Sequence, residues 1–303
     1  MKTFFIHAGT YKTGTSTIQN MIYDNRGILE EKGFYYPEAG LTKARRLGIR
    51  HYYLMYEIVR GNQLNYWKEL LKEISKVEQE KILLSHENFF SPSIDPKKIV
   101  SRLDGYEIKL IVYLRNPIDY IESCYREWVQ NVDKYDKSID VFFSWRKKWL
   151  SYKKMIEKWE RVIGSENISI GIFDKNCLYM NDIKFDFLRK IGLKDIKIRE
   201  NENYNRTLKS NEILKILLMN REVKGELYLN SIERILENSF ERNNSDRRIV
   251  NDTIIETIRN DGYEKEFLFL RDSLGFYYDG KSKFLSLPYD DLFDDIEKKT
   301  RKV

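Results

Sequence analysis

The sequence has few of the residues that mark disulfide-rich, metal-binding or membrane-spanning proteins. Its two cysteines, Cys124 and Cys177, lie far apart and match neither a disulfide framework nor a metal-ligand spacing. No stretch reaches the ~18 apolar residues of a spanning helix. The apolar run at Phe4 to Ile6 is shorter than the roughly 7 residues that a secretory signal needs. We therefore expect a reduced, cytoplasmic protein without a transmembrane segment.

Proline, internal repeats and low-complexity linkers are also scarce. Only five prolines occur among 303 residues, and hydrophobic residues make up 42% of the chain. This is enough apolar material for one large core. We expect a single domain over residues 1–303, with an α/β core over 1–200 and a helical C-terminal extension over 201–303.

The charge balance is mildly basic, with a net charge of +6. This net charge has two interpretations. It can reflect a lysine-rich solvated surface, or it can create a field that attracts anionic ligands. The sequence has no zinc-finger spacing and no RNA-recognition signature, so we expect no nucleic-acid partner. It also has no cluster of residues typical of a metal site, and the oligomeric state cannot be read from it.

Short apolar segments alternate with amphipathic ones along the first 200 residues. Residues 2–8, 34–37, 81–85, 108–114 and 168–173 are predicted strands. Residues 15–31, 51–59, 66–77, 117–132, 142–162 and 182–191 are predicted helices. This alternation is typical of βαβ units, so the predicted fold is a three-layer α/β fold with a mostly parallel sheet flanked by helices.

The most informative segment follows the first predicted strand and precedes the first predicted helix. It reads His7-Ala8-Gly9-Thr10-Tyr11-Lys12-Thr13-Gly14-Thr15-Ser16-Thr17. Glycines allow a tight turn whose amides face one anion, and the helix N-terminus adds positive dipole charge. The predicted phosphate contacts are the backbone amides from Tyr11 to Ser16, the Lys12 ammonium and the loop hydroxyls. Gly9 and Gly14 have the spacing of the NTPase P-loop, but Thr15 stands where that loop has its lysine.

A second anion-binding candidate follows the predicted strand at 108–114. Arg115 ends this strand, and Ser123 follows eight residues later in the next predicted helix. Ligands of open α/β sheets bind at the carboxyl ends of strands, and an arginine with a hydroxyl can hold a phosphate. If this motif is considered alone, there is a second interpretation. Arg115 could form a salt bridge with a carboxylate, and Ser123 could be an ordinary serine on the face of a helix.

As an ordered pair, the two motifs resemble those of sulfotransferases that use 3′-phosphoadenosine 5′-phosphosulfate (PAPS) and release 3′-phosphoadenosine 5′-phosphate (PAP). The loop is similar to the bacterial, carbohydrate-type form His-x-Gly-x-His-Lys-Thr-Gly-Thr-Thr-Ser, with Tyr11 in place of the second histidine and Ser16-Thr17 in place of Thr-Ser. The resemblance implies a P-loop-like fold and no metal. It also implies that the loop holds the 5′-phosphosulfate and that Arg115 and Ser123 bind the 3′-phosphate.

Sulfuryl transfer to a hydroxyl or amine needs stabilisation of the leaving oxygen and a general base. We assign the first role to Lys12. For the base, Glu87 is the first candidate because it follows a predicted strand in a Ser-x-Glu pattern, and His86 and His51 are the alternatives. The sequence lacks the Arg-Lys-Gly-rich loop of cytosolic small-molecule sulfotransferases, which favours a glycan acceptor.

Three other functions remain open at this point. A P-loop kinase or NTPase would need a lysine after Gly14 and an aspartate for Mg²⁺. A non-catalytic nucleotide-binding module would keep the phosphate loop without turnover, and a basic nucleic-acid binder would show steep salt dependence. Trp145 and Trp149 could line an acceptor cleft, although a tryptophan stripe more often belongs to the core.

Overall fold

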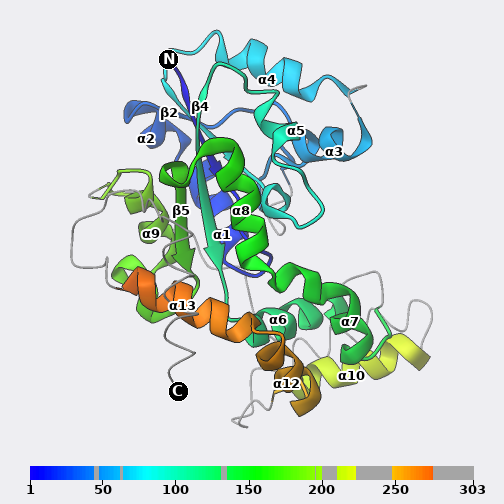
Figure 1. Cartoon of the computed structure of the whole chain (residues 1–303). Coiled ribbons are helices and arrows are strands. Elements are labelled where there is room, and N and C mark those ends of the chain that lie inside the picture. The colour runs from blue at the N-terminus through cyan, green and yellow to red at the C-terminus, as the bar shows by residue number, and fades with distance from the viewer. Residues whose placement is uncertain are drawn as a thin grey trace. The chain divides into compact units, whose positions relative to one another are not determined.

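The computed structural model describes residues 1–43, 48–61, 64–130, 135–194, 196–199, 210–222 and 248–275 (Figure 1). The Asn-rich stretch at 201–208, a further segment of the sequence that is similar to this family, lies outside these residues. No helix among the described residues is long and apolar enough to cross a membrane.

A five-stranded parallel sheet forms the centre of the fold, as the alternating pattern predicted. Its strands, in the spatial order β2-β3-β1-β4-β5, are β2 (Phe34–Tyr35), β3 (Lys81–Ser85), β1 (Thr3–His7), β4 (Glu107–Leu114) and β5 (Ile168–Ile172). Every paired neighbour is parallel. Strand β1 therefore lies in the middle, and the loop that follows it opens at the centre of the sheet's carboxyl edge.

Helices cover the sheet on both faces. The helices of the described residues, in chain order and over both compact units, are α1 (Thr15–Asp24), α2 (Arg26–Glu31), α3 (Tyr52–Arg60), α4 (Tyr66–Ile74), α5 (Lys97–Val100), α6 (Pro117–Gln130), α7 (Ile139–Arg146), α8 (Tyr152–Ile163), α9 (Ile183–Lys190), α10 (Ser210–Glu222), α12 (Asp252–Asn260) and α13 (Tyr263–Gly275). Short 3₁₀ segments are η3 (Glu87–Phe90), η4 (Lys147–Leu150), η5 (Ser165–Asn167), η6 (Lys175–Cys177) and η7 (Tyr179–Asn181).

Apolar residues on both faces of the strands bury the sheet between helix layers. Helices α1 and α9 lie side by side on one face, and α8 packs against β4 and β5 from the other (Figure 1). The core on the α1 side includes Phe5, Leu83, Ile111, Ile18, Ile22 and Phe187. Parallel strands buried on both faces are typically continuous apolar runs, which is why the sequence predicted them well.

The described residues form two compact units. Those of Met1–Arg115, Ser151–Glu202 and Leu268–Val303 make up the first unit, which holds the sheet. Those of Asn116–Leu150 and Asn203–Phe267 make up the second. In the second unit, α10 packs on α6, and the buried Asn220 side chain donates hydrogen bonds to the carbonyls of Val129 and Tyr135, each at 2.9 Å.

Two of the predicted helices are interrupted. The helix expected over residues 15–31 ends at Asn25 (φ −110°, ψ 19°), where α2 begins. The Asn25 side chain bonds the backbone of Arg199, so a distant contact stabilises the break. The helix expected over residues 142–162 is α7, η4 and α8, interrupted at Ser151 (ψ 63°). Beyond this break the Tyr152 hydroxyl donates to the Arg115 carbonyl at 2.8 Å.

Candidate active site

The loop between β1 and α1 is anchored to β4 at its start. The Ala8 amide donates to the Ile111 carbonyl at 2.8 Å, and the Thr10 amide donates to the Tyr113 carbonyl at 3.2 Å. The Thr13 hydroxyl donates to the Thr10 carbonyl at 2.6 Å, and both threonines are fully buried. The proton of the Thr13 hydroxyl is therefore engaged within the loop. Its backbone amide is the remaining donor for the anion contact that the sequence suggested.

The backbone of this loop has the conformation of an anion-binding turn. Lys12 has φ 63° and Gly14 has φ 75°, while Thr13 between them has a negative φ. Alternating handedness of this kind turns successive amides toward one side and forms a concave anion site. Gly9 is required by space, because a Cβ there would lie 2.5 Å from Thr15 Cγ2 and 2.7 Å from Thr13 Oγ1. The glycine and the strained lysine together produce the tight turn.

The first turn of α1 follows directly and offers unused donors. Gly14 is its N-cap without a side-chain cap, and the first turn contains no acidic residue. The amides of a first helical turn have no partners inside the helix and carry positive partial charge. Among the described residues, the hydroxyls of Thr15, Ser16 and Thr17 make no hydrogen bond to the protein. These groups can bind a phosphate-like anion without breaking an existing contact.

Arg115, directly after β4, contacts the predicted phosphate loop, by which we mean the segment from His7 to Thr17 that joins β1 to α1. Its Nη1 donates to the Lys12 carbonyl at 2.9 Å, and its guanidinium carbon lies 5.5 Å from the centroid of the Phe173 ring. The structure thus brings together Arg115 and the loop, which are 103 residues apart. Ser123, the other predicted contact of the 3′-phosphate, lies on α6 and belongs to the second unit.

The predicted base candidates lie at the same carboxyl edge of the sheet. His7 at the end of β1 pairs in register with Ser85 at the end of β3, and its Nδ1 lies 2.8 Å from Ser85 Oγ. The His86 amide then donates to the His7 carbonyl at 3.1 Å. The segment that carries His86 and Glu87 is therefore tied directly to the residue that begins the phosphate loop.

Glu87 forms a nearly buried ion pair. Its Oε1 lies 2.7 Å from Arg50 Nη1, and the two side chains are 6% and 18% exposed, respectively. Its Oε2 is buried and has no hydrogen-bond partner among the described residues. Unpaired buried carboxylate oxygens cost free energy, so such an atom is a good candidate for contact with a ligand. Arg50 neutralises the carboxylate while this oxygen stays available.

The hydrogen bonds of the histidines set their tautomers. His86 Nδ1 accepts from the Asn88 amide at 2.9 Å, so a neutral His86 carries its proton on Nε2. That Nε2 is buried and has no partner among the described residues. His51 Nδ1 accepts from the Ser85 amide at 3.1 Å, and its Nε2 donates to the Pro37 carbonyl at 3.1 Å. His51 thus supports the backbone with both nitrogens, whereas His86 presents an unused N–H donor.

Burial keeps all three histidines neutral. Desolvation lowers the pKa of His86 to about 4, despite the opposing effect of the Glu87 carboxylate. The same cause lowers the pKa of His51 and that of His7 to about 3 each. At neutral pH, His86 is therefore an uncharged hydrogen-bond donor, and its only free nitrogen is already protonated.

Tyr11 connects the phosphate loop to the His86 segment. Its hydroxyl donates to Asn88 Oδ1 at 2.6 Å, and the Asn88 amide in turn bonds His86. The sequence indicated only a backbone role for Tyr11 and none for Asn88 or Arg50. Asn88 follows the predicted His86-Glu87 pair directly, so its position was a usable signal. The sequence contains no comparable signal for Arg50, because its pairing with Glu87 arises from the fold.

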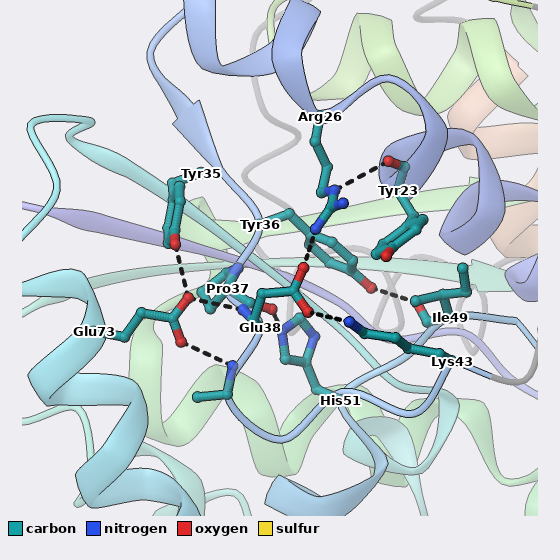
Figure 2. Close-up of polar contacts among 11 residues, drawn as sticks. Tyr23, Arg26, Tyr35, Tyr36, Pro37, Glu38, Lys43, Ile49, His51 and Glu73 are labelled. Carbon is teal, nitrogen blue, oxygen red and sulfur yellow. Dashed lines mark hydrogen bonds and ion pairs between the residues drawn. The ribbon is translucent and has the colours of Figure 1, made fainter.

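A polar network stabilises the segment that carries Arg50 and begins α3 (Figure 2). Glu73 on α4 accepts from the Tyr35 hydroxyl at 2.7 Å and from the amides of Glu38 and Ala39 at 2.8 Å each. The Glu73 carboxylate accepts all three of these hydrogen bonds. It therefore anchors the chain as it leaves β2. Burial and this hydrogen bond both raise the pKa of Tyr35.

The same segment is also held by an ion-pair cluster around Glu38 and by a hydrogen bond from Tyr36 to the backbone (Figure 2). Glu38 pairs with Arg26 and, at 3.1 Å, with Lys43. The Tyr36 hydroxyl donates to the Ile49 carbonyl at 2.7 Å, directly before Arg50. The position of Arg50 beside Glu87 therefore depends on contacts with β2, α2 and α4.

No group of three or more histidine, cysteine, aspartate or glutamate side chains suited to a metal ion occurs in the described parts of the chain. The hydrogen-bond donors and cations described at this edge are amides, hydroxyls, Lys12 and Arg115.

No protein-family model matches the chain, and no curated protein matches it. Some solved structures are similar to it at low identity. A sulfotransferase from Alicyclobacillus acidocaldarius is 14% identical, with a TM-score of 0.43 over 78% of this chain and 96% of that one. A mouse sulfotransferase complexed with PAP is 14% identical, with a TM-score of 0.42 over 91% of this chain and 88% of that one. A retinol dehydratase in complex with androsterone and PAP is 11% identical, with a TM-score of 0.32 over 95% and 84%. The function proposed below rests on the residues of this chain.

Proposed function

We propose that this protein is a cytoplasmic sulfotransferase that transfers the sulfuryl group of PAPS to a hydroxyl or amine, with a carbohydrate as the acceptor. The observation that carries the proposal is the loop after β1. It combines Lys12 and Gly14 at positive φ with the unused hydroxyls of Thr15 and Ser16 at a helix N-terminus that lacks acidic residues. The anionic 5′-phosphosulfate of PAPS suits this set of donors.

In this proposal, the amides from Tyr11 to Ser16 hold the 5′-phosphate, and Gly9 and Gly14 allow their turn. Lys12 neutralises the charge that develops on the bridging oxygen as the S–O bond breaks and PAP leaves with the electron pair. Arg115 and Ser123 bind the 3′-phosphate, as the resemblance implies.

Glu87 receives the acceptor proton in the proposed reaction. The acceptor oxygen forms its bond to sulfur while its proton passes to Glu87 Oε2, the oxygen that has no partner within the described structure. His86 is the less suitable base because the Asn88 amide occupies its basic nitrogen. Its Nε2–H is suited instead to donate to a sulfuryl oxygen, and His51, with both nitrogens engaged, serves as support.

A calorimetric titration with PAP in the presence of EDTA tests the donor site, with ATP, ADP and AMP as controls. PAP is expected to bind, and AMP, which lacks the 3′-phosphate, is expected to bind more weakly by about tenfold or more. Arg115→Ala and Ser123→Ala should reduce this preference. ATP binding that is tighter than PAP binding and requires Mg²⁺ would favour the kinase or NTPase alternative instead.

Lys12→Gly separates the role of the ammonium from that of the fold. Since Lys12 has φ 63°, glycine relieves backbone strain, and the variant should fold at least as well as the wild type. We expect its transfer rate to fall about 10²–10³-fold, as for loss of one transition-state donor. Lys32→Ala, at an exposed residue that ends α2, is the matched control. An unchanged rate in Lys12→Gly would reject the catalytic role, and PAP binding without any transfer to a panel of acceptors would favour a non-catalytic module.

A further inference from the structure

Helix α3 has an unusual outer face of aromatic rings. Tyr52 and Tyr53 are each 38% exposed and Tyr56 is 37% exposed, while Leu54 and Ile58 on the same helix are buried in the core. The outer face of such a helix is normally charged or polar. Exposed aromatic rings that gather on one face often mark a binding surface.

Two of these tyrosines lead toward the proposed catalytic edge. The Tyr56 and Tyr52 rings are stacked, with centroids 6.0 Å apart and an interplanar angle of 24°. The Tyr52 ring in turn lies 5.9 Å from the His86 ring. We call Tyr56, Tyr52 and His86 the ring ladder. It runs from the exposed surface of α3 to the buried imidazole whose Nε2 has no partner among the described residues.

We propose that the ring ladder is the acceptor subsite and that its occupant is an oligosaccharide chain. The inference rests on the proposed function, because it identifies His86 and Glu87 as the place where the acceptor hydroxyl reacts. Sugar rings place an apolar C–H face on tyrosine rings, while their hydroxyls stay in water or bond to the tyrosine hydroxyls. A saccharide that stacks on Tyr56 and Tyr52 extends along the ladder toward His86, whose ring centroid lies 5.9 Å from that of Tyr52.

The exposure of the rings favours a glycan over a small phenol or steroid. Small apolar ligands bind in cavities that bury most of their surface. The two tyrosines instead keep more than a third of their surface in solvent. A water-soluble chain that needs only one face covered is the ligand class that fits such an open platform. Arg60, whose guanidinium carbon lies 5.7 Å from the Tyr56 ring centroid, adds a cation at the outer end.

The tryptophans that the sequence offered for this role are less suitable. Trp149 is buried, at 7% exposure. Trp145 is 37% exposed, like Tyr56, but it packs against the rings of Trp128 and Phe142 at 5.1 Å each and belongs to the second unit. Its equal exposure makes it a matched control.

The test is binding of the full-length protein to an array of unsulfated oligosaccharides, neutral and uronate-containing, with 2-naphthol as a small aromatic competitor. We expect at least one oligosaccharide to bind, and Tyr56→Ala to weaken it by about tenfold or more. Tyr56→Phe should retain most of the affinity because it keeps the ring, and Trp145→Ala should bind like the wild type. Tyr56 does not contact His86 in the ladder, so its replacement leaves the catalytic edge intact.

The inference is overturned if no oligosaccharide binds, if Trp145→Ala weakens binding as much as Tyr56→Ala, or if 2-naphthol alone depends on Tyr56. A PAP titration of the same variants keeps the two proposals apart. Tyr56→Ala should bind PAP within about twofold of the wild type, since Tyr56 is not one of the residues proposed to hold PAP. Failure of PAP to bind the wild type would reject the donor site, while the array would still decide the ring ladder.

Discussion

At the residue scale, His86 and Glu87 are adjacent in the chain but differ in what they can do with a proton. His86 accepts a backbone amide on Nδ1 and holds its proton on Nε2, and burial lowers its pKa to about 4. Glu87 is paired with Arg50 through one oxygen and has a second, buried oxygen without a partner in the described residues. The two side chains therefore suit complementary roles as donor and base.

Replacing each of them separately tests this assignment. Glu87→Gln should lower kcat by about 10²–10⁴-fold, because an amide cannot take up the acceptor proton. His86→Asn keeps an acceptor for the Asn88 amide and loses only the Nε2–H donor, so its kcat should fall less than that of Glu87→Gln. The measurement is kcat of the wild type and both variants with the same acceptor. A larger loss of kcat in His86→Asn than in Glu87→Gln would reverse the roles.

Most residues of the candidate site were predicted from local signals in the sequence. Lys12, Gly9 and Gly14 stand out because glycine, lysine and hydroxyl residues follow a strand and precede a helix. Arg50 could not be found in this way. Its pairing with Glu87 joins residues 37 positions apart and depends on the anchoring of the intervening segment by Glu73 and Glu38.

At the scale of elements, the phosphate loop depends on one position without a side chain. A methyl group at Gly9 would collide with Thr15 and Thr13, which close the turn. We expect Gly9→Ala to lower the free energy of unfolding by about 1–3 kcal/mol, as overpacking does, and to abolish PAP binding. Chemical denaturation and PAP titration measure the two effects.

Gly27→Ala is the matched control for this prediction. Gly27 lies in α2 with no atom within 4 Å of its added Cβ, so alanine should raise the free energy of unfolding by roughly 0.5–1 kcal/mol. Equal stability and equal PAP affinity in Gly9→Ala and the wild type would contradict the tight turn that we describe.

The elements themselves were predictable where the cause is local. Strand β3 (Lys81–Ser85) has the predicted boundaries because an apolar run is bounded by polar residues. The interruptions at Asn25 and Ser151 were missed because neither residue is a glycine or proline and the apolar period continues across each. Asn25 is held by the backbone of Arg199, a contact that no local pattern can indicate.

At the scale of the whole molecule, the three buried histidines make stability depend on pH. The folded-state pKa values, about 3 for His7 and His51 and about 4 for His86, lie below the ordinary value of 6.5. The unfolded chain therefore binds more protons than the folded one below pH 6.5. The stability is fully present above this pH and is lost as pH falls toward 4.

Each histidine should contribute a loss of up to about 1.4 kcal/mol per pH unit within this window. Denaturation at pH 5.5 should show uptake of up to three protons from the histidines on unfolding, since the chain has three of them. His86→Asn removes one of these sites and should reduce the uptake by about one proton. The same uptake in the variant and the wild type would show that His86 is not held neutral by the fold.

The chain leaves the first unit after Arg115 and returns to it at Ser151, and this order matters during synthesis. Strands β1, β3 and β4 have left the ribosome well before β5 (Ile168–Ile172) is translated. Until then, the edge of β4 that pairs with β5 has unpaired amides and carbonyls, which favour pairing with other chains. A chain truncated before Ile168 lacks β5 and thus presents an incomplete sheet, and we expect it to bind chaperones that release the chain once β5 has been added.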